Sequence, residues 1–176
     1  MVTIRKATPA DAPGIALVHV DSWRTTYKGI VADEFLQSLS VEHRAQAWAE
    51  ILANPEHPAF LFVAENEGEE IMGFVSGRTE RDHDAEYTGE VGAIYLLKQA
   101  QGQGTGRRMM QAAARELMQR GHLSMLLWVL KDNFPARKFY EALGGKYLRE
   151  KPIQIGEQSL IEVAYGWNDL NTLAKE

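Results

Sequence analysis

Three glycines at alternate positions, followed by two arginines, form the part of the sequence with the clearest chemical meaning. They are Gly102, Gly104 and Gly106, and Arg107 and Arg108 come directly after them. Glycine lets main-chain N–H groups approach an anion without obstruction, and the first turn of a helix adds unpaired donors and the positive end of its dipole. The pattern indicates a phosphate-binding turn, although a strand-to-helix turn without a ligand would have the same composition.

The spacing of these glycines argues against two common phosphate-binding motifs. A nucleoside triphosphate loop needs Lys and then Ser or Thr after its last glycine, whereas two arginines stand there in this chain. A dinucleotide fingerprint needs G-x-G-x-x-G, and here the third glycine comes one residue too early. A phosphate ligand of another kind is therefore expected.

Two secondary-structure elements must hold this turn in place. The apolar run from Val91 to Leu97 carries no charge and is too short for a helix, so it predicts a buried strand. After the turn, apolar residues recur at helical spacing from Met109 to Met118, which predicts an amphipathic helix. The order is strand, glycine turn, helix.

The turn and its flanks fill a recognisable pattern. Gln101, Gly104 and Gly106 match Q/R-x-x-G-x-G/A directly after the strand EVGAIYL. This arrangement resembles the GNAT superfamily of acyl-CoA-dependent N-acetyltransferases, in which the loop and the helix start bind the pyrophosphate of coenzyme A.

A second segment is similar to the same family. GNAT domains often have Asn at the end of a later strand, followed by an FYEKLGF-like helix, and the matching residues are Asn133, Phe139, Tyr140, Glu141, Leu143 and Gly144. The sequence departs from the pattern at Gly145, where the family commonly has an aromatic residue. Local packing around Gly145 is therefore open.

Composition and length are those of a globular protein. The chain has 176 residues, of which 45% are hydrophobic and 24% charged, and we expect one domain spanning residues 1–176. The absence of cysteine excludes disulfides, zinc–thiolate sites and a cysteine acyl-enzyme. The net charge of −5 argues against nucleic acid as a partner. We expect a cytoplasmic protein, because no apolar run is long enough to span a membrane and the first residues lack a signal-peptide core.

The remaining pattern alternates strands and helices along the chain. We expect short strands at Val2–Ile4, Phe60–Glu65, Ile71–Arg78, Leu123–Leu130, Lys146–Arg149 and Leu160–Trp167. We expect helices from Pro9 to about Arg24, from about Asp33, from Glu42 to Leu52 and from Pro135 to Gly144. Pattern alone predicts an α/β domain. The resemblance implies a mixed, strongly twisted sheet with helices on both faces, in which the strands around Ile94 and Val129 splay apart.

The resemblance also implies where acetyl-CoA binds. The main chain at Ile94, Tyr95 and Leu96 would pair with the pantetheine arm, and Asn133 would hydrogen-bond it unless it only caps a helix. The phosphates would lie on the loop that comprises Gln101, Gly102, Gln103, Gly104, Thr105, Gly106 and Arg107.

Two residues are candidates for catalysis. A base must take a proton from the acceptor, because an amine with a pKa near 10.4 is protonated at neutral pH. Glu90 stands where GNAT enzymes often place a catalytic Glu, with Glu86 as a second candidate and a polar strand end as the alternative. Tyr140 matches the family's usual donor of a proton to the departing thiolate, although it could be a core tyrosine.

The resemblance also implies an acceptor site near Trp23 and Tyr27, which otherwise would pack the edge of the core. An acidic stretch from Thr79 to Glu90 holds five acids and one arginine, and it reads most simply as a solvated loop. Its Asp82, His83 and Asp84 are adjacent and cannot easily converge on one ion, so we expect no metal.

The sequence therefore predicts an N-acetyltransferase that transfers an acetyl group from acetyl-CoA to a primary amine by direct attack in a ternary complex. The acidic charge favours a small cationic amine as acceptor. A protein or peptide acceptor, a non-catalytic acyl-CoA-binding or sensing domain, and a nucleotide-binding protein of another fold stay open as alternatives. A homodimer is possible on family grounds.

Overall fold

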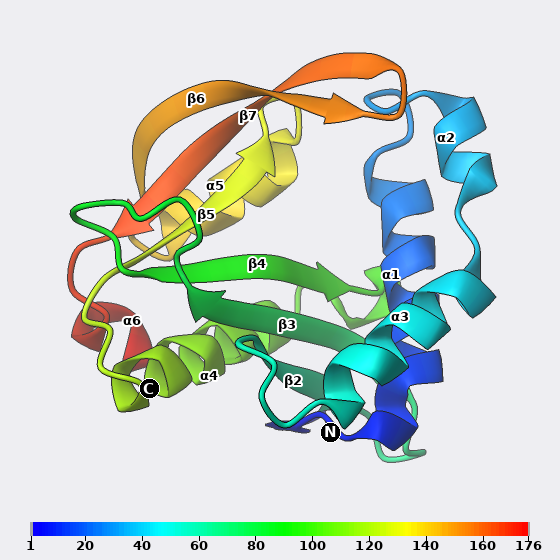
Figure 1. The fold of residues 1–176 in the computed structure, drawn as a ribbon, viewed down its shortest axis with the longest axis horizontal. Coiled ribbons are helices and arrows are strands. Elements are labelled where there is room, and N and C mark those ends of the chain that lie inside the picture. The colour runs from blue at the N-terminus through cyan, green and yellow to red at the C-terminus, as the bar shows by residue number, and fades with distance from the viewer. Residues whose placement is uncertain (1, 176) are drawn as a thin grey trace.

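The structure is a computed structural model that describes residues 2–175, and its strands form one seven-stranded sheet (Figure 1). The strands are β1 (Thr3–Lys6), β2 (Phe60–Glu65), β3 (Ile71–Thr79), β4 (Gly89–Leu96), β5 (Met125–Leu130), β6 (Lys146–Ile155) and β7 (Gln158–Trp167). Their order in the sheet is β1-β2-β3-β4-β5-β7-β6. All neighbours are antiparallel except β4 and β5, so the sheet is mixed.

The described residues also form six α-helices, five of them between strands and one after β7. They are α1 (Ala12–Thr26), α2 (Asp33–Ser38), α3 (Val41–Ala53), α4 (Thr105–Gln119), α5 (Phe134–Ala142) and α6 (Asn171–Ala174). Short 3-10 turns at Pro9–Asp11 and Lys98–Ala100 precede α1 and α4. None of the helices in the described part of the chain is long and apolar enough to cross a membrane.

Alternation along β2 explains why helices cover both faces of the sheet. Phe60 and Ala64 pack in one cluster with apolar residues of α4, whereas Leu61 and Val63 pack in another with Ile15 of α1. Successive side chains of a strand point to opposite faces, so a strand that is apolar throughout must be covered on both sides. The sheet is therefore the middle of three layers.

The predicted fold class is confirmed, and so are most of the predicted elements. The main difference lies in β6 and β7, which are ten residues long each, longer than the predicted strands at 146–149 and 160–167. Most side chains of β6 are exposed or half-buried, so its sequence lacks the apolar run that would reveal its full length. The short helix α6 was not predicted.

The turn between β6 and β7 packs against the start of α2 (Figure 1). The side chain of Gln158 donates to the carbonyl of Ile30 at 3.1 Å and accepts from the N–H of Ala32 at 2.9 Å. A Cβ atom at Gly156 would lie 2.9 Å from the ring of Phe35. The hairpin is thereby fixed to the segment that joins α1 to α2.

Candidate active site

The gap in the sheet lies between β4 and β5. These strands pair at only three positions, ending with Val91 opposite Leu127. Beyond that point β4 pairs with β3 alone and β5 pairs with β7 alone. The main chain at Ile94, Tyr95 and Leu96 therefore faces the gap on its β5 side, where an extended ligand could pair with it.

A β-bulge marks the start of this gap. Ser76 pairs with Ala93 and Gly77 with Val91, so Gly92 is the extra residue in β4. Bulges are common next to active sites because they redirect the main chain locally. Here the bulge lies two residues after Glu90, at the mouth of the gap.

The glycine loop, residues 101–107, follows β4 and leads into α4. Gly102 and Gly104 have φ values of 73° and 80°, which residues with a side chain rarely adopt. Helix α4 begins at Thr105. Gln101 is turned back toward β4, where its amide donates to the carbonyl of Leu96 at 2.9 Å. The loop thus presents the first-turn N–H groups of a 15-residue helix beside the end of β4.

The residues that flank the helix start fit the same arrangement. Gly106 lies against α5, since a Cβ atom there would be 3.1 Å from the ring of Phe139. Arg107 is exposed, whereas Arg108 donates to the carbonyl of Val2 at 2.8 Å. The structure brings together all the loop residues predicted to bind the cofactor. Both arginines are exposed, and Arg108 is the one that is bonded to a main-chain carbonyl.

Asn133 is buried and caps α5. Its Oδ1 accepts a hydrogen bond from the N–H of Ala136 at 3.3 Å. Helix capping, one of the two roles considered for this residue, is therefore present in the structure.

A cleft of about 390 Å³ lies where β4 and β5 diverge. One wall is apolar, and its side chains pack together around Trp23, Tyr27, Tyr95, Leu130, Ile153 and Ile155. The polar side chains that line the cleft are Arg81, Asp82, Glu90, Lys151 and Glu162. The volume is within the range of small-molecule sites in proteins.

Trp23 and Tyr27, the residues expected at the acceptor site, both line this cleft. Their rings meet edge to face with centroids 4.8 Å apart, and Tyr27 is buried. The indole Nε1 of Trp23 is buried and has no hydrogen-bond partner among the described residues. It is therefore a donor available for a ligand.

Glu90 also lines the cleft, but its carboxylate already has a partner. It is 1% exposed and receives bonds from the guanidinium of Arg81, whose Nε lies 3.0 Å from Oε1 and whose Nη2 also donates to Oε1. Arg78 Nε is 3.8 Å from the other carboxylate oxygen. The structure therefore holds Glu90 in an ion pair at the wall of the cleft.

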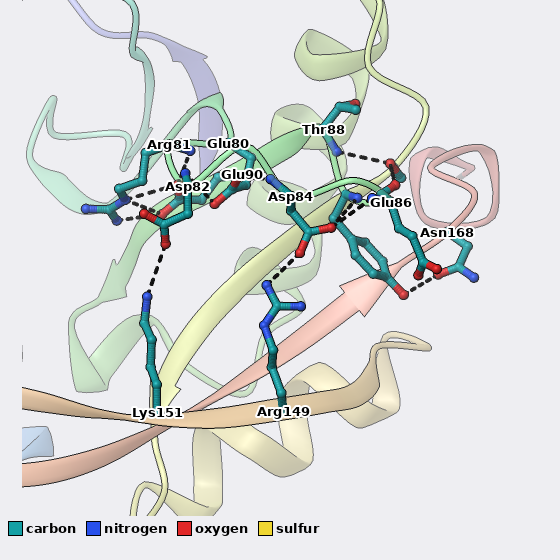
Figure 2. A network of polar contacts seen from close by, with 12 residues as sticks. Glu80, Arg81, Asp82, Asp84, Glu86, Thr88, Glu90, Arg149, Lys151 and Asn168 are labelled. Atoms are coloured by element: carbon teal, nitrogen blue, oxygen red, sulfur yellow. Dashed lines mark hydrogen bonds and ion pairs between the residues drawn. The ribbon is translucent and has the colours of Figure 1, made fainter.

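The acidic loop that carries Arg81 is ordered by contacts to β6. Figure 2 shows Lys151 and Arg149 pointing from β6 toward Asp82 and Asp84, with Nζ–Oδ2 and Nη2–Oδ2 distances of 3.2 and 2.6 Å. Buried Glu80 accepts from the N–H groups of both aspartates, at 2.9 and 2.7 Å. The loop is largely solvent-exposed, as expected from the sequence, and these contacts also hold it at the edge of the cleft.

Two further predictions concerned this loop: Glu86 as a second candidate base, and no metal site. Glu86 is exposed and is not one of the residues that line the cleft, while its carbonyl accepts from Ser124 Oγ at 2.6 Å. No three potential ligands among His, Asp and Glu converge in residues 2–175.

Tyr140 lies behind the gap in the main core, 7% exposed, between Phe139 and Trp167. Burial raises the pKa of Tyr140, and the nearby hydroxyl of Tyr95 raises it further. Tyr95 and Tyr27 in turn share a hydrogen bond of 3.2 Å between their hydroxyls. The phenol of Tyr140 is thus protonated, which is the form that can donate, but it is a weaker acid than an exposed tyrosine.

Most residues of the cleft were not predicted from the sequence, among them Glu162 on β7, Lys151 on β6 and Trp128 on β5. Lys151 Nζ lies 4.1 Å from the ring centroid of Trp128 and 3.8 Å from Glu162. Glu162 lies within the strand predicted at 160–167, and a longer prediction for β6 would have placed Lys151 on a strand as well, but which side of each strand faces the cleft could not be predicted from local pattern.

Comparison with known proteins agrees with this geometry. Residues 21–145 match the acetyltransferase (GNAT) family. The chain is 39% identical over 173 residues to the "Uncharacterized N-acetyltransferase YuaI" of Bacillus subtilis (strain 168), covering 98% of this chain and 96% of that protein.

Solved structures share the fold. An N-acetyltransferase from Staphylococcus aureus Mu50 has a TM-score of 0.74 at 21% identity, covering 97% of this chain and 99% of the other. The PaiA N-acetyltransferase of Thermoplasma acidophilum, crystallised with coenzyme A, has a TM-score of 0.73 at 21% identity, covering 92% and 98%.

The fold and the divided sheet define an acyltransferase architecture. The chain belongs to the acetyltransferase (GNAT) family. The resemblance seen in the sequence is thereby confirmed, and with it the class of enzyme, an N-acetyltransferase whose co-substrate is acetyl-CoA.

Proposed function

We propose that this protein transfers the acetyl group of acetyl-CoA to the primary amine of a small molecule, by direct attack in a ternary complex. One observation carries the proposal: a single gap in the sheet connects the glycine loop to a cleft lined by carboxylates and aromatic rings. Such an arrangement would hold two substrates end to end, with their reacting atoms at the divergence of β4 and β5.

The residues present fit acetyl-CoA. The glycine loop and the first turn of α4 offer N–H groups for phosphates, with Arg107 exposed beside them. The unpaired side of β4 at Ile94, Tyr95 and Leu96 suits an extended amide-containing arm such as pantetheine. Acetyl-CoA supplies the thioester carbonyl that is attacked.

Three groups of this chain would serve the reaction. A main-chain N–H of β4 near the bulge at Gly92 would stabilise negative charge on the carbonyl oxygen. A carboxylate of the cleft would take the proton of the acceptor ammonium; the family pattern implies Glu90, which could do so once Arg81 leaves it. Tyr140 would protonate the departing thiolate.

A small acceptor is favoured over a peptide by the closure of the cleft. The β6–β7 hairpin is hydrogen-bonded through Gln158 to the segment between α1 and α2. Apolar residues of this segment pack with Trp23 and Tyr27 and so extend the apolar wall of the cleft. An extended polypeptide would have to displace this contact.

The test combines acetyl-CoA titration calorimetry with thiol release across a panel of primary amines. We expect the wild type to bind acetyl-CoA and to release thiol only when an amine is present. Tyr140→Phe should bind acetyl-CoA as tightly and lose about 100-fold or more in kcat, the usual contribution of a general acid.

The matched control is Tyr147→Phe, which alters an exposed tyrosine on β6 and should leave both measurements unchanged. Binding without amine-dependent thiol release would favour an acyl-CoA sensor over an enzyme. Equal kcat in wild type and Tyr140→Phe would remove Tyr140 from the mechanism.

A further inference from the structure

The charges that line the cleft do not cancel. Three carboxylates, of Asp82, Glu90 and Glu162, face two cations, of Arg81 and Lys151. Arg78, which is not one of the lining residues, lies 3.8 Å from Glu90, so the lining itself carries one excess negative charge and that excess does not lie at Glu90. The site is therefore suited to a ligand with one positive charge.

The ion pairs show where this excess lies. Arg81 holds Glu90, and Lys151 Nζ is 3.2 Å from an Asp82 oxygen. Glu162 has Lys151 Nζ as its nearest cation, at 3.8 Å, which is too long for a hydrogen bond. Among the described residues it is the cleft carboxylate without a hydrogen-bond donor.

Glu162 is also placed for contact with an acceptor. It lies on β7 opposite Leu130 of β5 and Lys151 of β6, beside the point where β5 has left β4. Its side chain is 13% exposed, and the cleft is the space that it lines. A carboxylate so far removed from water gains strongly from a cation that can donate to it.

We propose that Glu162 binds the ammonium group of the acceptor and accepts its proton, and that the acceptor is a primary amine with one positive charge and an apolar body. This inference rests on the proposed function. One N–H proton of the ammonium passes to a Glu162 oxygen, the freed nitrogen lone pair forms the new C–N bond, and the C–S bond breaks with its electron pair on sulfur. The nitrogen loses a second proton as the amide forms, and this balances the proton that the thiolate takes up, so the products are the amide, the coenzyme A thiol and protonated Glu162.

The apolar wall defines the rest of the acceptor. Trp23, Tyr27 and Tyr95 line the cleft together with Ile153 and Ile155. A polyamine would bring several positive charges to a site that compensates one. Its further ammonium groups would also lie against the apolar wall, where they would find no hydrogen-bond partner. An arylalkylamine satisfies both parts of the cleft.

The electrostatic surroundings of Glu162 support a role as base. Burial raises the pKa of Glu162, Lys151 and Arg81 oppose that rise, and Glu90 and Asp82 add to it. A carboxylate with a raised pKa accepts a proton more readily than an ordinary one.

The experiment uses 2-phenylethylamine and spermidine as probes. Their binding to the protein saturated with coenzyme A is measured by calorimetry, and thiol release from acetyl-CoA is measured from pH 5 to 9. The variants are Glu162→Gln, Glu90→Gln and the control Glu150→Gln, which removes an exposed carboxylate of β6 outside the cleft.

We expect the wild type to bind and acetylate 2-phenylethylamine in preference to spermidine. Glu162→Gln should weaken the binding of 2-phenylethylamine at least tenfold, lower kcat/KM about 100-fold or more, and abolish the fall of kcat/KM at acid pH, with acetyl-CoA affinity unchanged. Glu150→Gln should match the wild type.

Three results would overturn the inference: amine binding that is unchanged in Glu162→Gln, an acid limb lost in Glu90→Gln and kept in Glu162→Gln, or a wild type that prefers spermidine. Failure of the proposed function is a separate result. In that case the wild type binds acetyl-CoA and releases no thiol with any amine, while the binding measurement still decides whether Glu162 holds an ammonium.

Discussion

The glycine loop and the cleft lie at opposite ends of one gap, and they are built in different ways. The glycine loop is a run of seven consecutive residues, 101–107, whose shape follows from the positive φ of Gly102 and Gly104. The cleft is assembled from α1, the acidic loop, β4, β5, β6 and β7, and long-range ion pairs fix its polar side chains. A locally encoded site tolerates change elsewhere in the chain, whereas an assembled site depends on every element that contributes to it.

The largest effect on stability is expected from breaking an ion pair of the cleft. Arg81→Leu removes the guanidinium that holds Glu90, which is 1% exposed, and leaves a buried carboxylate with the long main-chain bond from residue 81 and Arg78 at 3.8 Å as its nearest cation. We expect a loss of about 2–3 kcal/mol in the free energy of unfolding, measured by urea denaturation, because an unpaired buried charge is costly.

Two variants make this measurement specific. Arg81→Leu combined with Glu90→Gln should regain about 1 kcal/mol or more, since the uncompensated charge is gone. Arg149→Leu, which breaks a more exposed pair with Asp84, should cost under about 1 kcal/mol. Equal losses for Arg81→Leu and Arg149→Leu would show that the pair at Glu90 contributes no more to the free energy of unfolding than the pair at Asp84.

The second prediction concerns the pH dependence of stability and involves His19, which stacks on the cleft residue Tyr95. Burial lowers the pKa of His19 from 6.5 to about 4, and Arg44 adds to the shift, while the ring stacks on Tyr95 with centroids 5.3 Å apart. Between these pH values the unfolded chain binds the proton more readily, so stability falls as pH drops from 6.5 toward 4.

We expect wild-type stability to fall by about 2 kcal/mol from pH 7 to pH 5 through His19 alone. His19→Gln should flatten that slope in urea denaturation, and the exposed His43→Gln should keep it. A slope that is the same in His19→Gln would mean that other groups carry the acid sensitivity.

The smallest expected change in stability tests the local site. Gly104→Ala forces a side chain into a φ of 80° at the residue before α4 and should cost about 1 kcal/mol. We expect acetyl-CoA affinity to fall about tenfold in calorimetry because the N–H groups of the loop shift, with amine binding to the cleft unchanged.

Gly68→Ala serves as the matched glycine control, because Gly68 lies in the β2–β3 turn without a positive φ. It should change neither acetyl-CoA affinity nor stability by more than about 0.5 kcal/mol. If Gly104→Ala weakened amine binding as much as acetyl-CoA binding, the two sites would not be as separate as their construction suggests.

The contrast between the two sites also explains what the sequence could reveal. The loop from Gln101 to Arg107 was predicted in full because its glycine spacing, the strand before it and the helix after it are local signals. Trp23 and Tyr27 were placed at the acceptor side through the resemblance alone. Glu162 and Lys151 were missed, because which strand positions face a cleft depends on how a hairpin is laid across the sheet.

The ion pair of Glu90 was beyond sequence reasoning for a related reason. Arg81 is nine residues away in a loop with five acids, and which of them it would pair with depends on the path of the loop. The departure at Gly145 has an explanation that only the structure supplies. A Cβ atom there would lie 2.6 Å from the ring of Trp167, so an aromatic ring from β7 occupies the space beside this position.

The contact between the β6–β7 hairpin and the start of α2 bears on how such a protein diversifies. The hairpin closes the cleft through Gln158 and contributes nothing to the glycine loop. Insertions or deletions at its tip would alter the length of acceptor that fits while leaving the acyl donor site untouched. Descendants of one ancestral gene could thus exchange acceptors by changing a surface turn, without altering the reaction itself.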